Sequence, residues 1–183
     1  MKKYKSFLLA VLLISSANIF FGQESSSQSR WRLGTAILGG YTYNSDDFAK
    51  DFNDYGSCLW SVDVLYNRIQ ASLYASKGWG SDNDMFDYGL RAGYNVIDGN
   101  VWGITPFLGF GIMYFGHDSS LENLPAPSAG TNLDFKFYKN KKSKHNDIWM
   151  IRLQYNCSLP CKDETVGYVH RIMLGVAVSG LLF

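Results

Sequence analysis

Histidine and serine residues give this chain its clearest potential for catalysis. The run His117-Asp118-Ser119-Ser120 holds a base, an acid and two hydroxyls, and His170 stands near the C-terminus. Acyl transfer needs a nucleophile beside an imidazole that a third group orients, so the groups must converge in space. Neighbours in one loop do not form such a site by themselves, although His170 could act as the base for a nearby serine. We therefore expect no catalytic residues.

The three cysteines suggest redox chemistry rather than metal binding. Cys157 and Cys161 lie four positions apart in NCSLPCKD, and this spacing allows a local disulfide in an oxidising compartment. An odd count leaves Cys58 over, so pairing of Cys58 with either of the other two stays open. No histidine shares the cysteine spacing, and we expect neither a metal site nor a cofactor.

Charged residues of both signs stand alone among small and apolar residues. They are Arg32, Asp63, Asp87, Arg91, Asp134, Arg152 and Arg171. Charges away from water must be paired, because an isolated buried charge costs several kcal/mol. We expect these seven residues to form one network of ion pairs inside the protein.

Apolar and polar residues alternate at period two along eight stretches, which predicts eight strands. The expected strands span residues 30–43, 58–66, 69–79, 85–96, 101–115, 131–138, 147–157 and 168–183. The clearest is 85–96, where Phe86, Tyr88 and Leu90 share one face and Asp87 and Arg91 share the other. No long segment has the 3.6-residue period of a helix.

The composition of the two strand faces indicates what each face contacts. One face is bulky and apolar, while the other combines isolated charges with many glycines. A water-facing sheet surface is instead rich in Lys and Glu and poor in Gly. Small residues and paired charges suit a narrow closed lumen, and the bulky face then contacts lipid, as in transmembrane barrels. The reverse arrangement, a soluble lipocalin-like carrier with an apolar lumen, is the alternative.

Aromatic residues gather toward the ends of the expected strands. Two girdles of rings at the membrane interfaces would produce this pattern. We expect Trp31, Trp102 and Trp149 in the girdle near one rim, and Trp60 and Tyr155 in the girdle near the other.

The connections alternate in length. Residues 67–68 and 98–100 are tight turns, whereas residues 44–57, 80–84, 116–130 and 158–167 are long polar links. Short turns on one rim and long loops on the other are typical of outer-membrane barrels. The basic link 139–146 (KNKKSKHN) is the exception on the short-turn rim, and we interpret it as a solvated loop.

The N-terminal segment predicts export. Three lysines precede an apolar run and are followed by small residues, which is the layout of a secretory signal peptide. We expect residues 1–22 to be cleaved after Gly22, with Ala17 as the alternative position, leaving a barrel domain over residues 23–183.

Composition excludes two other classes of protein. The 183 residues carry a net charge of +1, with 18% charged and 16% aromatic residues. A nucleic-acid binder driven by bulk charge would be strongly basic. An acidic disordered chain would not hold so many rings.

The chain resembles the small eight-stranded outer-membrane barrels of the OmpA-membrane-domain and OmpX type. The resemblance rests on the strand pattern, on the strand–turn–strand segment GYNVIDGNVWGITPFLGFG (residues 93–111) and on the terminal aromatic residue Phe183. It implies a monomer in outer-membrane lipid, with Phe183 read by the barrel-assembly machinery. We expect a structural or surface-binding role through the long loops, with no open pore. An outer-membrane lipid-modifying enzyme, similar to a lipid A deacylase, is the alternative.

Overall fold

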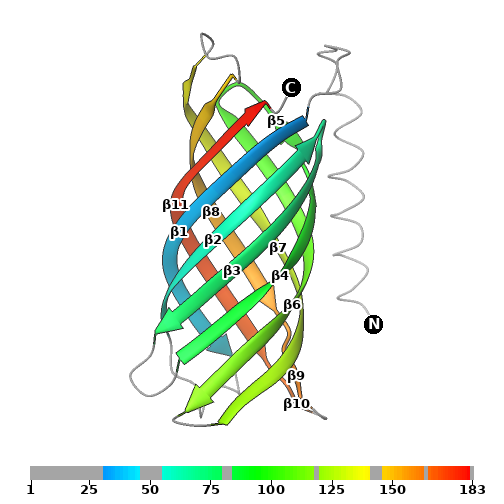
Figure 1. The fold of residues 1–183 in the computed structure, drawn as a ribbon, viewed down its shortest axis with the longest axis vertical. Coiled ribbons are helices and arrows are strands. Elements are labelled where there is room, and N and C mark those ends of the chain that lie inside the picture. The colour runs from blue at the N-terminus through cyan, green and yellow to red at the C-terminus, as the bar shows by residue number, and fades with distance from the viewer. Residues whose placement is uncertain are drawn as a thin grey trace, which may run out of the picture.

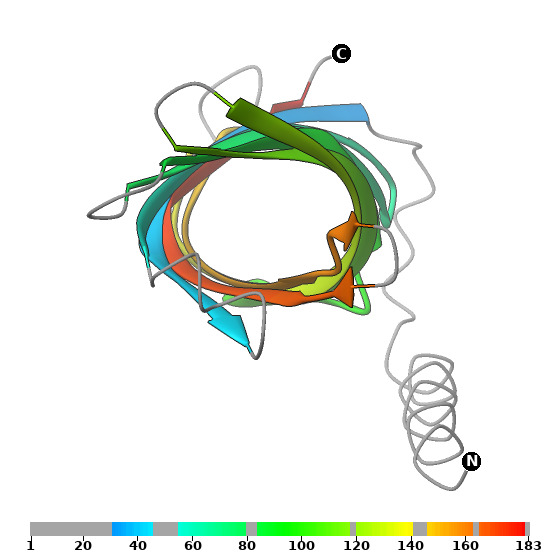
Figure 2. The ribbon, with the colours of Figure 1, turned by 90° about the horizontal axis from the view of Figure 1, so that it is seen from below.

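The computed structural model describes residues 31–45, 55–79, 84–117, 120–140, 146–162 and 165–181. Within these residues the chain forms a closed antiparallel barrel of eight long strands (Figure 1, Figure 2). The expected all-β, eight-stranded fold is therefore confirmed. The segment expected to be a signal peptide and Phe183 lie outside the described residues. No helix among the described residues is long and apolar enough to span a membrane.

Each long strand pairs with its neighbours in sequence, and β1 pairs with the last strand to close the barrel. The long strands are β1 (Trp31–Ser45), β2 (Tyr55–Tyr66), β3 (Ile69–Trp79), β4 (Asp84–Tyr94), β6 (Trp102–His117), β7 (Ser120–Lys139), β8 (Ile148–Ser158) and β11 (Tyr168–Leu181). The short strands are β5 (Ile97–Asp98), β9 (Cys161–Lys162) and β10 (Thr165–Val166). A two-residue turn joins β2 to β3 at the short-turn rim. There Asn67 adopts the positive φ of 54° that a tight hairpin needs.

The stagger of the strands sets the width of the barrel. From Gly34 in β1, the paired residue on each successive strand can be traced once around the barrel. The path returns to β1 at Asn44, so the shear is 44 − 34 = 10 residues. This path runs through Asp63, Ser72, Arg91, Gly109, Ser128, Ser158 and Val169. Eight strands with such a stagger are tilted by about 35–45° and enclose an interior that side chains can fill.

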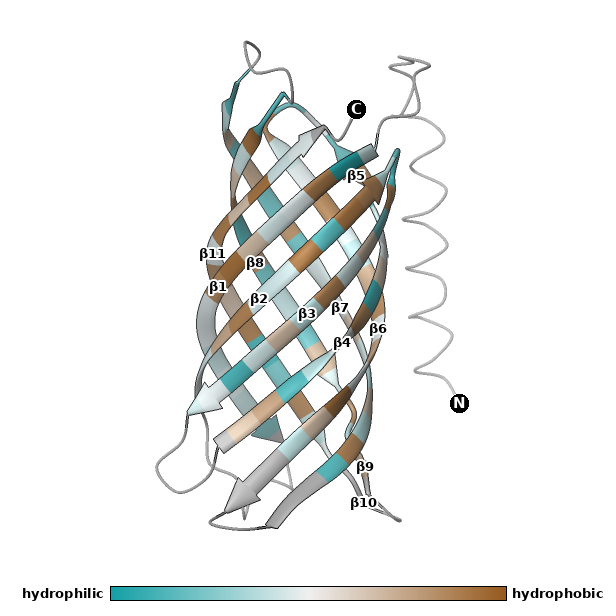
Figure 3. Ribbon diagram, viewed as in Figure 1, coloured by the Kyte–Doolittle hydropathy of each residue, from teal (hydrophilic) through white to brown (hydrophobic). Residues whose placement is uncertain are grey.

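Burial alternates along most of each long strand, and the bulky apolar side chains are the exposed ones. Hydrophobic and hydrophilic residues alternate along the same strands in Figure 3. In β8, Ile151 and Leu153 are exposed, whereas Arg152 and Gln154 are buried in the lumen. The predicted orientation of the two strand faces is thus correct. The alternative, a soluble carrier with an apolar lumen, is wrong because the lumen contains buried charged and polar residues. An exterior of this composition is stable in lipid and not in water.

The predicted long loop over residues 116–130 is wrong. β6 and β7 continue as a hairpin to the pair His117 and Ser120, so β7 begins eleven residues before the expected strand at 131. Pro125 and Pro127 are unusual within a strand, because proline donates no hydrogen bond to a ladder. The β7–β8 ladder begins only at Ser128, and the carbonyl of Pro127 accepts from Leu159 on the β8 side. Both proline nitrogens therefore point to an edge without a partner strand, where proline costs nothing.

Pro106 marks a second irregularity. Gly93 pairs with Phe107 and Ile97 pairs with Ile104, so three residues of the preceding segment (94–96) oppose two residues of β6 (105–106). The extra residue therefore lies in the strand opposite Pro106 and not in the proline strand itself. The short ladder that follows is closed by the turn after Asp98, where the Gly99 amide donates to the Trp102 carbonyl.

Candidate functional site

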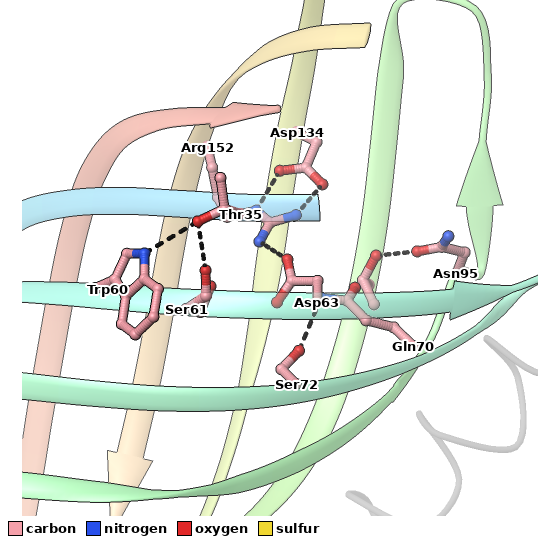
Figure 4. A network of polar contacts seen from close by, with 10 residues as sticks. Thr35, Trp60, Ser61, Asp63, Gln70, Ser72, Asn95, Asp134 and Arg152 are labelled. Carbon is pink, nitrogen blue, oxygen red and sulfur yellow. Dashed lines mark hydrogen bonds and ion pairs between the residues drawn. The ribbon is translucent and has the colours of Figure 1, made fainter. Parts of the chain in front are cut away.

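Arg152 joins two aspartates across the lumen (Figure 4). Its Nη1 lies 2.7 Å from Asp63 Oδ2, and its Nε and Nη2 lie 2.7 and 3.1 Å from the two carboxylate oxygens of Asp134. The side chains of all three residues are at least nine-tenths buried. Ser72 adds a hydroxyl hydrogen bond to Asp63. A bidentate guanidinium–carboxylate pair is among the strongest polar contacts in proteins, so this cluster ties β2, β7 and β8 together from inside.

A second ion pair fills the lumen closer to the long-loop rim. Arg171 Nη1 lies 2.9 Å from Asp87 Oδ2, and the side chains are 0% and 1% exposed. The Ser76 hydroxyl donates to the other carboxylate oxygen, and Arg171 Nη2 lies 3.7 Å from the sulfur of Met85. This cluster links β3, β4 and β11 and neutralises both buried charges.

Arg91 differs from the expected network. Its guanidinium carbon lies 3.7 Å from the Tyr74 ring centroid and 4.9 Å from that of Phe107, and in the described part of the chain it forms no ion pair. Cation–π contacts with two desolvated rings stabilise the charge in place of a carboxylate. The neighbouring Gly109 makes room, since a Cβ there would lie 2.9 Å from Arg91 Cγ. The expectation of a single network is therefore wrong. The charges form two separate ion-pair clusters, and Arg91 stacks on aromatic rings instead.

Replacing Arg91 by methionine should lower the free energy of unfolding by about 0.5–2 kcal/mol, the value of the lost cation–π contacts. Met fills similar volume and leaves no carboxylate without its partner. Urea unfolding of the barrel in lipid vesicles would measure the change. A loss as large as that from removing Arg152 would show that Arg91 also compensates the aspartates directly.

Apolar side chains close the lumen toward the long-loop rim. The cluster consists of Met85, Met113, Leu124, Ala126 and Val169, each at most 5% exposed, from β4, β6, β7 and β11. Sequence reasoning missed this closure, because Leu124 and Ala126 fall in the segment interpreted as a loop. Their alternation with Asn123, Pro125 and Pro127 was the signal that could have revealed a strand. Ion pairs and apolar side chains together fill this part of the interior.

A cavity of about 190 Å³, here called the short-turn cavity, lies at the short-turn rim. Its described lining comprises Arg32, Asp98, Gly99, Asn100, Lys136, Phe137, Tyr138, Lys139 and Ile148. Lys136 Nζ contacts the Asp98 carboxylate and donates to the Gly99 carbonyl at 2.8 Å. Arg32, expected in the central network, thus lines this cavity.

Three of the five expected girdle residues lie at the short-turn rim. Trp31 packs on Tyr66 with ring centroids 4.7 Å apart, and Trp102 packs on Phe135 at 5.0 Å. Trp149 pairs with Tyr138 across β7 and β8. These positions agree with the girdle interpretation.

Trp60 and Tyr155, expected near the other rim, lie farther along their strands. Trp60 pairs with Ile37, which is six residues from Trp31 (37 − 31), and Tyr155 is likewise six residues along β8 from Trp149 (155 − 149). Trp60 is thus near the middle of β2, whereas Tyr155 is only three residues from the long-loop end of β8 at Ser158. Sequence could not show this, because strand ends and register were needed to set the depth.

Polar atoms in the apolar band find protein partners. The Trp60 indole nitrogen donates to Thr35 Oγ1 at 3.1 Å, and this hydroxyl donates to the Ser61 carbonyl at 2.9 Å (Figure 4). The Tyr155 hydroxyl lies 2.9 Å from His170 Nδ1. Because lipid offers no hydrogen bonds, internal pairing is the way to satisfy such groups.

His170 lies in an aromatic cluster on the outer surface. The rings of Tyr43, Tyr155 and Tyr168 are 6.1–6.2 Å from the imidazole, and Cys157 pairs with His170 across β8 and β11. Ser119 and the side chains of His117 and Ser120 lie outside the description. Among the described residues no serine, base and acid converge as a catalytic triad requires.

The described cysteines are free thiols. The disulfide expected from the spacing of Cys157 and Cys161 is absent from the structure. Cys157 ends the outward row of β8, whereas Cys161 lies beyond a bend in the short β9–β10 hairpin. Cys58 pairs with Gly39 in β1, which is separated from β8 by β11, so it too is remote from Cys157. No group of three His, Cys, Asp or Glu residues in the described ranges could hold a metal ion.

Comparison with known proteins shows the fold. No family model and no curated protein matches the sequence. Neisserial surface protein A is 12% identical, with a TM-score of 0.54 over 81% of this chain and 96% of that chain. The N-terminal barrel domain of Pseudomonas aeruginosa OprF is 14% identical, with a TM-score of 0.52 over 85% of this chain and 100% of that domain. With its apolar exterior and closed eight-stranded architecture, the chain has the fold of the small outer-membrane β-barrels.

Proposed function

We propose that the protein is a closed outer-membrane barrel that acts at the cell surface as a structural or binding protein, without enzymatic activity and without an open pore. The observation that carries the proposal is the filling of the lumen by Arg152, Arg171 and their aspartates, together with the apolar closure around Met85 and Met113. A filled lumen supports rigidity rather than transport.

The β6–β7 hairpin is the described feature best suited to present a binding surface. Its outward residues Asn123, Pro125 and Pro127 are exposed and lack the bulk of the lipid-facing rows. The two prolines remove donors from the free edge of β7, so a foreign strand cannot extend the sheet there. Recognition at this hairpin therefore relies on side chains and on the neighbouring loops.

The partners follow from the same proposal. The apolar exterior contacts outer-membrane lipid, and the barrel-assembly machinery inserts the chain after cleavage of the signal peptide. The closed barrel pairs the edges of its sheet without a second copy, so the proposed working form is a monomer. The proposal involves no nucleic acid and no cofactor.

Two epitope insertions test location and orientation together. A tag between His117 and Ser120 should be labelled by antibody on intact cells, whereas a tag between Gly99 and Asn100 should be labelled only after permeabilisation. Both tagged proteins should be found in the outer-membrane fraction and shift on gels upon boiling. Labelling of the second tag alone on intact cells would reverse the orientation. A soluble, heat-insensitive band would overturn the membrane assignment.

A further inference from the structure

Basic side chains predominate in the described lining of the short-turn cavity. Arg32, Lys136 and Lys139 line it together with one described carboxylate, that of Asp98. This contrasts with the ion-pair clusters farther inside, where carboxylates accompany Arg152 and Arg171. Excess charge at the open end of a cavity attracts anions.

A β-bulge directs Lys139 toward this cavity. Lys136 pairs with Met150, but the register then shifts, so Tyr138 pairs with Trp149 and Lys139 pairs with Ile148. Ile148 faces the lumen and is 3% exposed. Uninterrupted alternation from the lumen-facing Lys136 would direct Lys139 to the lipid side. The extra residue in β7 therefore places a second lysine on the lumen side, which is a common use of bulges.

The cationic groups are held in different ways. Lys136 is fixed by the Asp98 carboxylate and by the Gly99 carbonyl at 2.8 Å. Lys139 has no ion-pair partner in the described part of the chain. The cavity thus combines a fixed ammonium group with an uncompensated one, and Arg32 and the amide of Asn100 border the same space.

We propose that the short-turn cavity binds a small phosphate-bearing anion. Guanidinium and ammonium groups are the side chains that proteins use for phosphate, and the described lining offers both kinds. The cavity of about 190 Å³ exceeds the space of a single water, roughly 30 Å³. The phosphate could belong to a free solute or to a lipid headgroup. This inference needs the barrel fold but not the surface role proposed above.

Titration of the purified protein in zwitterionic micelles with inorganic pyrophosphate tests the proposal. Backbone amide resonances of Gly99, Asn100 and Lys139 should shift and saturate. Sodium chloride at equal ionic strength should not reproduce the shift. The variant Lys139→Gln should raise the dissociation constant at least tenfold. The matched control Lys77→Gln removes an ammonium group that lies 5.8 Å from the Trp79 ring, on a different strand and outside the cavity lining, and should leave binding unchanged.

A second arm distinguishes the source of the phosphate. In discs of phosphatidylcholine with a fraction of phosphatidylglycerol, the same amides should shift without pyrophosphate if a lipid headgroup enters the cavity. If only pyrophosphate shifts them, the ligand is a free phosphate compound. Because Lys139 is exposed, its variant should keep the heat-shifted gel band that reports a folded barrel. Equal effects of chloride and pyrophosphate, or unaltered affinity of Lys139→Gln, would overturn the proposal.

Discussion

Replacing Arg152 by methionine should lower the free energy of unfolding by about 3–5 kcal/mol, which is the usual cost of breaking a buried ion pair. The variant leaves Asp63 and Asp134 buried in the lumen without the guanidinium that lies 2.7 Å from each. Methionine keeps most of the volume, so the loss reports charge rather than a cavity. Urea unfolding in lipid vesicles, followed by tryptophan fluorescence, gives the free energy directly.

The triple variant Asp63→Asn, Asp134→Asn and Arg152→Met is the matched control. It removes all three charges of the cluster, and most of the stability lost by the single variant should return because no buried charge is left unpaired. If the triple variant is as unstable as Arg152→Met alone, the loss arises from packing of the arginine side chain and not from uncompensated carboxylates.

Replacing Gly40 by alanine should be the second costly change, lowering the free energy of unfolding by about 1–3 kcal/mol. A Cβ at this inward position would lie 2.1 Å from the Ile172 carbonyl oxygen and 2.7 Å from Met173 Cα. These are backbone atoms of the neighbouring strand β11, so relief requires moving a strand rather than rotating a side chain. The β1–β11 seam, where the barrel closes, would be strained.

The adjacent residue provides the control. Gly39 faces outward, and a Cβ there meets nothing within 4 Å. None of the described glycines has a positive φ, so alanine fits the backbone at both positions. Gly39→Ala should leave the stability unchanged or raise it by up to about 1 kcal/mol, since alanine has less freedom in the unfolded chain. Equal destabilisation by both variants would indicate a backbone effect instead of the inward clash.

Alternation alone predicted most of the barrel. The strands over 69–79 and around Arg152 and Arg171 were placed well because a period of two is local and survives without knowledge of the partner strand. The strand over residues 120–130 was not predicted, because recognising it requires knowledge of the neighbouring strands. Pro125 and Pro127 cannot donate hydrogen bonds to a neighbouring strand. Only the arrangement of β6, β7 and β8 shows that no ladder partner lies on the β8 side of β7 at these two residues.

The candidate sites divide in the same way. The alternation at period two showed which charged residues face the lumen. Their partners depend on the shear of ten residues, which decides which side chains meet across the lumen. Arg91 meets Tyr74 and Phe107 instead of a carboxylate for this reason. Lys139 was assigned to a solvated loop, because the bulge that directs it toward the cavity leaves no mark in the hydropathy pattern.

The sequence by itself determined which face of each strand meets lipid, since side-chain size and charge on the two faces differ at every second residue. It also determined that charges of both signs are enclosed, because the alternation places them opposite the bulky face. Only the tertiary structure decided how these charges pair, where the rings lie in depth and which residues line the short-turn cavity. Those features depend on the stagger between strands distant in sequence, and stagger is set by closure of the whole barrel.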